Sequence, residues 1–205
     1  MKISSLNCRS LKKHYKDILS DSLLLKSDII LLQETWLEDH IHLEDLEIPN
    51  YILQLNSCGR GRGIATYYKA NIFAHEKDIK EEHMQLSKFT SNNLDILSIY
   101  RSQPGNYEAL NQKIEDLIDR EKPQLVVGDF NYCYLNSSSN STKIYFRENH
   151  FEQLIREPTH IEGNLLDQAH LRDIKGNLRC TVKLHSKYFT DHKGLSIIVK
   201  TGILE

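Results

Sequence analysis

A chain of 205 residues with 40% hydrophobic content is long enough for one sizeable core and short for two, so we expect a single domain over residues 1–205. The formal net charge of −2 argues against a protein that holds nucleic acid by overall positive charge, so any contact with a polyanion must be local. The four cysteines form no CxxC pair, the N-terminus lacks a signal-peptide core, and no apolar run reaches the roughly 20 residues of a membrane span, which predicts a soluble intracellular protein with free thiols.

The beginning of the chain predicts a strand, a helix and a second strand. Residues 2–6 have the pattern of a first strand, and Ser10 can cap a helix whose apolar positions follow the helical period as far as Leu23. Residues 28–33 are then mostly apolar, as in a buried strand, and this run ends at Glu34.

The middle of the chain predicts a hairpin and then a second strand–helix–strand unit. Strands at 51–55 and 64–68 flank a turn-rich segment with three glycines, which suits an antiparallel hairpin. The second unit has, in order, a strand at 94–100, a turn at Pro104, Gly105 and Asn106, a helix with Leu110, Ile114, Leu117 and Ile118 on one face, and a strand at 125–128.

The last third predicts a polar surface loop at 135–142, a helix around 145–155, and strands at 165–171, 178–184 and 195–200. Strands therefore outnumber helices. A single doubly wound sheet would alternate strand and helix throughout, so the pattern favours a two-sheet sandwich covered by helices.

Polar side chains occur at or just after the ends of several predicted strands. A lone acid at such a place most often caps a loop or is solvated, but the carboxyl ends of neighbouring parallel strands meet at one edge of a sheet. An Asp that polarises water, an Asn that orients it and an Asp–His pair together suit phosphoester hydrolysis. The residues concerned are Asn7, Glu34, Tyr100, Asp129 with Asn131, Asp167, and Asp191 with His192.

Seven short segments, in order along the chain, give the sequence a strong resemblance to the endonuclease/exonuclease/phosphatase superfamily, and within it to endonuclease domains of non-LTR (LINE-type) retrotransposons. These segments are 6–11, 30–37, 99–102, 128–131 (Gly-Asp-Phe-Asn), 157–160, 165–167 and 190–193 (Thr-Asp-His-Lys). The resemblance implies a DNase I-like α/β (α+β) fold, a four-layer αββα sandwich of two mixed sheets flanked by helices. It also implies a metal-dependent endonuclease.

The resemblance assigns five residues to the metal ion and the attacking water. Glu34 matches the metal-binding glutamate, with Asn7 beside it and Asp191 on the opposite side of the site. Oxygen ligands of this kind suit Mg²⁺ or Mn²⁺. Asp129 matches the residue that activates or orients the water, and Asn131 helps to hold Asp129.

Three further residues are implied to act on the phosphate. His192 matches the imidazole that contacts the scissile phosphate, and Asp167 matches the acid that binds this ring and favours its protonated form. Tyr100 resembles a strand-end tyrosine that contacts phosphate, although a core aromatic with its hydroxyl at the surface fits the sequence nearly as well. The implied reaction is in-line hydrolysis of a phosphodiester that leaves a 3′-hydroxyl and a 5′-phosphate.

Substrate contacts are expected from the segment containing Thr159 and His160 and from basic side chains. His160 departs from the family pattern, in which an arginine commonly follows the Pro-Thr pair, and it would be largely neutral at pH 7. Ordinary solvated charge accounts for each basic residue taken singly. The candidates for contacts with the nucleic-acid backbone are Arg60, Arg62, Lys69, Arg101 and Lys193.

Several alternatives remain open at the level of sequence. Phosphoinositide phosphatases, sphingomyelinases and RNA deadenylases resemble the same fold, and a domain that binds without cutting would keep the same pattern. The segments at 34–37 and 158–159 favour DNA as the partner, and no membrane partner is expected. The resemblance further implies a nuclear location and a natural fusion to a reverse transcriptase.

Overall fold

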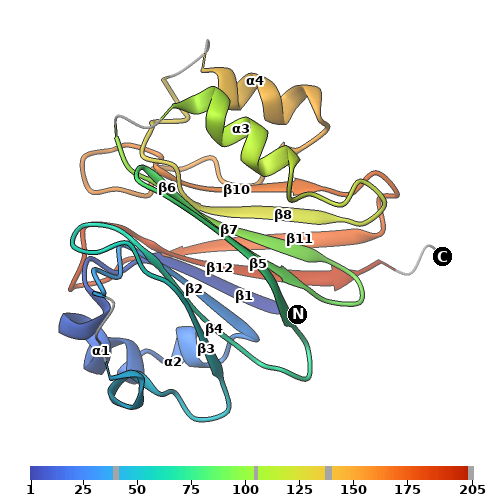
Figure 1. The fold of residues 1–205 in the computed structure, drawn as a ribbon. Helices are drawn as coiled ribbons and strands as arrows, with labels where there is room; N and C mark the ends of the chain where they lie inside the picture. The colour runs from blue at the N-terminus through green and yellow to red at the C-terminus, as the bar shows by residue number, and fades with distance from the viewer. Residues whose placement is uncertain (39–41, 104–105, 137–139, 203–205) are drawn as a thin grey trace.

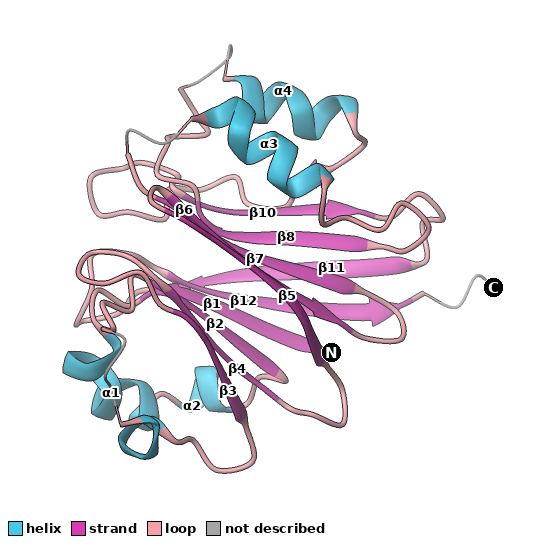
Figure 2. Ribbon diagram, viewed as in Figure 1, coloured by secondary structure: helices cyan, strands magenta, loops and turns pink. Residues whose placement is uncertain are grey.

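The computed structural model describes residues 1–38, 42–103, 106–136 and 140–202. Two six-stranded sheets face each other, with α1 and α2 on the outer side of one and α3 and α4 on the outer side of the other (Figure 1). Figure 2 shows the same four layers by type of secondary structure. This arrangement confirms the predicted DNase I-like αββα sandwich.

Both sheets mix parallel and antiparallel pairs. The first sheet has the order β11 (Leu178–His185), β12 (Gly194–Thr201), β1 (Lys2–Asn7), β2 (Ile29–Gln33), β4 (Ile64–Tyr68), β3 (Ile52–Asn56). The second has the order β5 (Ala74–Glu81), β6 (Met84–Thr90), β7 (Asp95–Arg101), β8 (Gln124–Asp129), β10 (Asp167–Arg172), β9 (Glu152–Gln153). The helices are α1 (Leu11–Ser20), α2 (Ser22–Leu25), α3 (Tyr107–Glu115), α4 (Ser141–Glu148) and the 3₁₀ helix η1 (Leu43–Leu46).

The apolar run of β2 is continuous because both faces of the strand are covered. Ile29 and Leu31 belong to the core between the two sheets, whereas Ile30 and Leu32 belong to the core under α1. In the second sheet Val127 faces the other sheet and Val126 faces α3 and α4. Alternate side chains of each central strand therefore fill different layers, which fixes the strand register.

Both predicted strand–helix–strand units are present. β1 pairs in parallel with β2, and β7 pairs in parallel with β8, so the carboxyl ends of each pair lie at the same edge. The predicted hairpin is also confirmed, since β3 and β4 are antiparallel. Of the turn predicted at Pro104, Gly105 and Asn106, the first two residues lie outside the described part of the chain, as do residues 137–139 of the predicted loop.

Two predicted helices have different bounds in the structure, and one pair of strands was not predicted. The helix expected to run to Leu23 stops at Ser20, because the Asp21 carboxylate accepts from the Leu23 and Leu24 backbone N–H groups and caps a separate short helix. The helix expected around 145–155 begins at Ser141, after the Asn140 cap, and ends at Glu148. The hairpin of β5 and β6 was not predicted at all, because β5 is an edge strand with a mostly polar sequence.

Gly128, just before the end of β8, has φ +149° and lies against β7. A Cβ at this position would be 1.9 Å from the Ile99 carbonyl oxygen, which is backbone and cannot step aside. We expect Gly128→Ala to destabilise the protein by about 3 kcal/mol or more in urea unfolding. Gly176→Ala is the matched control, since its φ is also positive (+66°) but nothing lies within 4 Å; it should cost only about 1 kcal/mol. Equal costs would show that the contact with Ile99 is unimportant.

Within the described ranges, none of the helices has both the length and the apolar character needed to cross a membrane.

Candidate active site

The strand ends of the two sheets meet at one place, and the Asn7 amide connects them. Asn7 at the end of β1 donates from Nδ2 to Glu34 Oε1 at 2.9 Å, just after β2, and to Asp129 Oδ2 at 2.8 Å, at the end of β8 in the other sheet. Its Oδ1 accepts from the Arg9 backbone N–H at 3.2 Å. The amide therefore turns its nitrogen, not its oxygen, towards the carboxylates. Asn7 holds two acids in place, which differs from the expected role as an oxygen ligand.

Several residues around this junction have a left-handed backbone. Arg9, Glu34, Trp36 and Asn131 have φ values of 44°, 51°, 55° and 51°. Non-glycine residues in this region cost energy and are kept where the surrounding structure requires them, most often at functional sites. Here the unusual backbone follows the ends of β1, β2 and β8, where it turns the chain sharply beside the site. Trp36 Nε1 also donates to Glu34 Oε2 at 3.3 Å.

Asp129 is fully buried and well supplied with donors. Its Oδ1 accepts from the Asn131 backbone N–H at 2.9 Å, and Asn131 Nδ2 in turn donates to the Arg101 carbonyl oxygen at 2.8 Å. Burial raises the pKa of the Asp129 carboxyl, and the nearby Asp167 charge raises it further, to about 7, against the lowering effect of His192. The placement agrees with the expected proximity of Asp129 and Asn131.

Asp167 and His192 form a buried pair. His192 Nδ1 lies 2.8 Å from Asp167 Oδ2, and the imidazole is 3% exposed. Burial alone would lower the pKa of His192, but the charge and hydrogen bond of Asp167, with the charges of Asp129 and Asp191, raise it to about 9. The imidazole is therefore protonated at neutral pH.

The pKa of His192 has a consequence for stability. Because the folded-state pKa, about 9, is above the ordinary value of 6.5, the stabilisation is complete below pH 6.5 and is lost as pH rises through 9. For the protein in EDTA we expect the free energy of unfolding to fall by about 3 kcal/mol across this window. His192→Gln removes the titrating group and should flatten the curve. Parallel curves for the two proteins, from urea unfolding at each pH, would contradict this assignment.

Asp191 completes the network on the other side of His192. Its Oδ1 lies 3.8 Å from His192 Nε2, and its Oδ2 lies 3.0 Å from His160 Nε2 and 2.8 Å from Arg9 Nη1. The backbone before it is tied to β1, since Thr190 Oγ1 donates to the Asn7 carbonyl oxygen at 3.0 Å. Arg9, with a side chain 46% exposed, was not among the residues expected at the site. In the sequence, the position of Arg9 directly after Asn7 and Cys8 was the only indication that it lies at the site.

Tyr100 lies at the end of β7, and its hydroxyl donates to the Gly61 carbonyl oxygen at 2.9 Å. Burial and the charges of Glu34 and Asp129 raise the pKa of this phenol, which keeps it a neutral donor. The contact also holds the segment with Arg60 and Arg62 beside the site, and the charge of Arg62 acts on Tyr100. Of the expected basic contacts, the charge of Arg62 is thus near the site, and Arg60 lies on the same segment.

The other expected substrate contacts are placed differently. The Arg101 prediction is wrong, because this side chain is 2% exposed, donates to the Phe130 carbonyl oxygen at 2.7 Å and stacks on Tyr107. Thr159 is fully buried, and its hydroxyl accepts from the Leu166 and Asp167 backbone N–H groups.

Lys69, His160 and Lys193, also expected to contact the substrate, have partners within the protein. Lys69 pairs with Asp28 at 3.0 Å, at the opposite end of β2 from Glu34, so it is not part of the site. Lys193 Nζ donates to the Pro158 carbonyl oxygen at 2.9 Å. His160 is 8% exposed and bonded to Asp191.

The carboxylates of this network suit a divalent cation. Glu34, Asp129, Asp167 and Asp191 bring several negative charges together, and the ligand atoms of Asp129, Asp167 and His192 lie within 4.8 Å of one another. Asp167 Oδ1 and Asp191 Oδ1 are buried and have no hydrogen-bond partner among the described residues. Buried, unsatisfied carboxylate oxygens are costly without a cation. The residues present therefore fit the implied metal.

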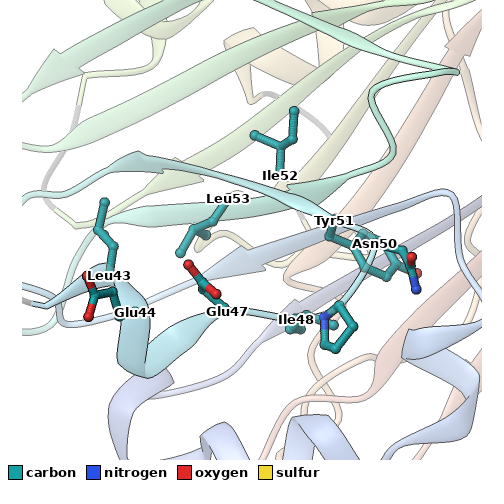
Figure 3. Close-up of a pocket in the computed structure, with 9 residues that line it drawn as sticks. Leu43, Glu44, Glu47, Ile48, Asn50, Tyr51, Ile52 and Leu53 are labelled. Carbon is teal, nitrogen blue, oxygen red and sulfur yellow. The ribbon is translucent and has the colours of Figure 1, made fainter.

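A pocket on the outer side of β3 lies apart from this network. It is formed by η1, the segment after it and β3, with Leu43, Glu47, Ile52 and Leu53 among its labelled residues (Figure 3). None of the residues of the carboxylate network lines it. The candidate active site is therefore the polar junction of the strand ends.

Comparisons with known proteins place this site in a wider context. Residues 4–190 match the family model described as the Endonuclease/Exonuclease/phosphatase family. No curated protein sequence matches the chain.

Four solved structures illustrate the shared fold. The 3′-5′ exonuclease NExo from Neisseria meningitidis has a TM-score of 0.75 at 14% identity, covering 97% of this chain and 99% of that one. A second structure, described as the 3′ phosphatase NExo from Neisseria bound to product DNA hairpin, gives 0.73 at 14% identity and coverages of 98% and 99%. An AP endonuclease from Archaeoglobus fulgidus gives 0.71 at 16% identity, with coverages of 97% and 98%. The endonuclease domain of TRAS1, a telomere-specific non-LTR retrotransposon, gives 0.68 at 12% identity, with 96% of each chain covered.

Proposed function

Because the chain belongs to the endonuclease/exonuclease/phosphatase family of hydrolases acting on phosphate esters, we propose that it is a Mg²⁺-dependent endonuclease that nicks DNA and leaves 3′-hydroxyl and 5′-phosphate ends. The observation that carries the proposal is the continuous network from Glu34 through Asn7 and Asp129 to the Asp167–His192 pair, which joins both sheets at one edge.

Asp129 orients and deprotonates the attacking water in this proposal. Its carboxylate is fixed by Asn7 and by the Asn131 backbone, so it does not need to reorganise during the reaction. A pKa of about 7 suits a general base that works near neutral pH. Asn131 supports the same carboxylate from the other side through its second, longer contact at 3.4 Å.

His192 meets the negative charge that develops on the phosphate. Its Nδ1 N–H donates to Asp167, and because the raised pKa of about 9 keeps the ring protonated, Nε2 carries a second N–H. A protonated imidazole held in this way stabilises the charge of the transition state before and during bond breaking. Tyr100, a neutral phenol at the edge of the site, can donate to another phosphate oxygen once it leaves Gly61.

Glu34 and Asp191 would hold the Mg²⁺ ion, with Asn7 fixing Glu34 through its amide nitrogen. The ion would supply a positive charge that neutralises the phosphate and offsets the surrounding carboxylates. In our proposal Arg9, which pairs with Asp191, moves to the substrate phosphate when the ion takes its place.

DNA is the substrate class that we favour. Arg60 and Arg62 lie on the segment that contacts Tyr100 and can meet phosphates on either side of the scissile one, which gives the local positive charge that an acidic chain requires. The motif order favours the retrotransposon type. NExo, which shares the fold, has been captured with a DNA hairpin, so the fold accommodates DNA.

A plasmid-nicking assay tests the proposal. Supercoiled plasmid with Mg²⁺ should become open-circular, EDTA should abolish nicking, and Mn²⁺ should restore it. Extension of the nicks by a DNA polymerase without phosphatase treatment would confirm the 3′-hydroxyl. Release of phosphate from a DNA 3′-phosphate with intact plasmid would instead identify a 3′ phosphatase. Cleavage of RNA alone, or tight DNA binding without turnover, would refute the proposed endonuclease.

A further inference from the structure

His160 belongs to the polar network, but the proposed reaction gives it no role. It lies opposite His192 in an isolated antiparallel bridge, and the two imidazole rings are 4.9 Å apart at an angle of 73°. Asp191 lies between them, with Oδ2 at 3.0 Å from His160 Nε2 and Oδ1 at 3.8 Å from His192 Nε2. One ligand atom from each of the three residues lies within 4.8 Å of the others.

The backbone fixes this group before any ligand arrives. The Lys193 N–H donates to the Thr159 carbonyl oxygen at 2.7 Å, and the Ile161 N–H donates to the Asp191 carbonyl oxygen at 3.0 Å. These two bonds flank the bridge and hold the segment before β10 against the segment before β12. Both imidazoles are more than nine-tenths buried, so their rings have little freedom to turn away.

The outer partner of His192 is typical of a metal-bound imidazole. Asp167 occupies His192 Nδ1 and leaves Nε2 directed at Asp191. His160 Nδ1 accepts from the Glu162 backbone N–H at 3.3 Å, and the Glu162 carboxylate lies 3.8 Å from the same nitrogen. A carboxylate on the far nitrogen orients a ligating histidine and raises its basicity. Asp191 Oδ1 has no hydrogen-bond partner among the residues described, so it is ready to accept a cation.

We propose that His160, Asp191 and His192 form a site for a borderline transition-metal ion such as Zn²⁺, and that the bound ion inhibits the proposed endonuclease. Two imidazoles and one carboxylate are a typical protein donor set for Zn²⁺, whereas Mg²⁺ takes oxygen ligands. Inhibition follows because the ion occupies Nε2 of His192 and the carboxylate of Asp191 at once. The proposed inhibition rests on the proposed function, whereas the proposed metal site does not.

Arg9 is the charge that the ion must displace. It pairs with the same Asp191 oxygen as His160, and its side chain is nearly half exposed, so it can return to solvent without leaving a buried charge. Divalent zinc binds nitrogen and oxygen donors more tightly than Mg²⁺ does, so Zn²⁺ should take Asp191 from the Mg²⁺ ion that Glu34 and Asp191 would hold.

Calorimetric titration of Zn²⁺ into chelator-treated protein, with Mg²⁺ present throughout, tests the site. Wild type should bind one Zn²⁺ per chain. Loss of an outer partner already costs 10–100-fold in metal affinity, so removing a direct ligand by His160→Gln should cost about 100-fold or more. His75→Gln is the matched control, because His75 pairs with Asp78 on β5, outside the network; it should bind like wild type.

Asp191→Asn, which removes a different ligand, should also lose Zn²⁺ and covers the case in which His160→Gln fails to fold, as judged by its urea midpoint. Equal Zn²⁺ affinity of wild type and either variant would overturn the site. In the nicking assay with Mg²⁺, wild type and His75→Gln should be inhibited at lower Zn²⁺ than His160→Gln. Zn²⁺ binding without inhibition of plasmid nicking would overturn the proposed inhibition. Absence of nicking at every Zn²⁺ concentration would refute the proposed function and leave the calorimetric result standing.

Discussion

Replacing Asp129 with asparagine should lower kcat/KM for plasmid nicking by about 10³-fold, because the carboxylate that takes the proton of the water is lost while its shape is kept. Asp129 is fully buried, contacts Asn7 and Asn131, and lies within a few ångströms of Asp167 and His192. Among the described residues, the other carboxylate to which Asn7 donates is Glu34, which our proposal assigns to the ion.

Asp95→Asn is the matched control for this variant. Asp95 is also a buried aspartate of the same strand pair, but it lies opposite Gln124 at the other end of β7 and β8, where it pairs with Lys88 and Lys122. It should change stability and leave kcat/KM within about twofold, since it is remote from the chemistry. Equal loss of nicking in both variants, at equal stability, would show that Asp129 acts through folding alone.

Replacing His192 with glutamine should lower kcat/KM by about 10³-fold as well, because a neutral amide cannot meet the charge of the transition state as an imidazolium does. Asp167→Asn should cost less, about 10²-fold, since Asp167 acts on the phosphate only by orienting and charging the ring at 2.8 Å. Nicking rates of both variants, with His75→Gln as a control outside the site, provide the measurement.

The double variant Asp167→Asn, His192→Gln separates a shared role from two independent ones. If Asp167 works through the ring, the double variant should be no slower than His192→Gln alone. Losses that multiply would mean that Asp167 acts elsewhere, for example on the ion. A pH profile adds a readout that folding does not move: the alkaline limit set by His192 should shift to lower pH in Asp167→Asn, because the carboxylate raises the pKa of the ring.

The residues at strand ends could be predicted because strand direction alone brings them together. Asn7 and Gln33 lie opposite each other in the parallel pair of β1 and β2, as Tyr100 and Asp129 do in β7 and β8. Glu34 then follows at the same edge. Once two parallel pairs are recognised, the edge at which the polar residues gather is fixed before any packing is known.

Strand geometry explains why Arg101 and Lys69 do not contact the substrate as predicted. Successive side chains of a strand point to opposite faces, so Tyr100 at the site sends Arg101 to the side of α3, where it meets Tyr107. β4 runs antiparallel to β2, so Lys69 after β4 must lie at the far end from Glu34.

Other features could not be derived in this way. The polar edge strand β5 shows no apolar alternation, because one of its sides has no neighbouring strand and its outer residues are solvated. The pairing of Arg9 and His160 with Asp191 depends on how two loops meet, which no local pattern of residue types encodes. Side-chain direction in irregular segments is a property of the assembled molecule.

The Asn7 amide links the two sheets. It donates to Glu34, which follows β2 in the same sheet as Asn7, and to Asp129 in the facing sheet. Turnover should therefore be sensitive to shear between the layers. A relative displacement of the two sheets by a few tenths of an ångström would separate Asp129, which is proposed to take the proton, from Glu34, which is proposed to hold the ion. Enlarging or shrinking apolar side chains midway between the layers, such as Leu31 or Val127, should slow the enzyme although every polar group of the site is intact.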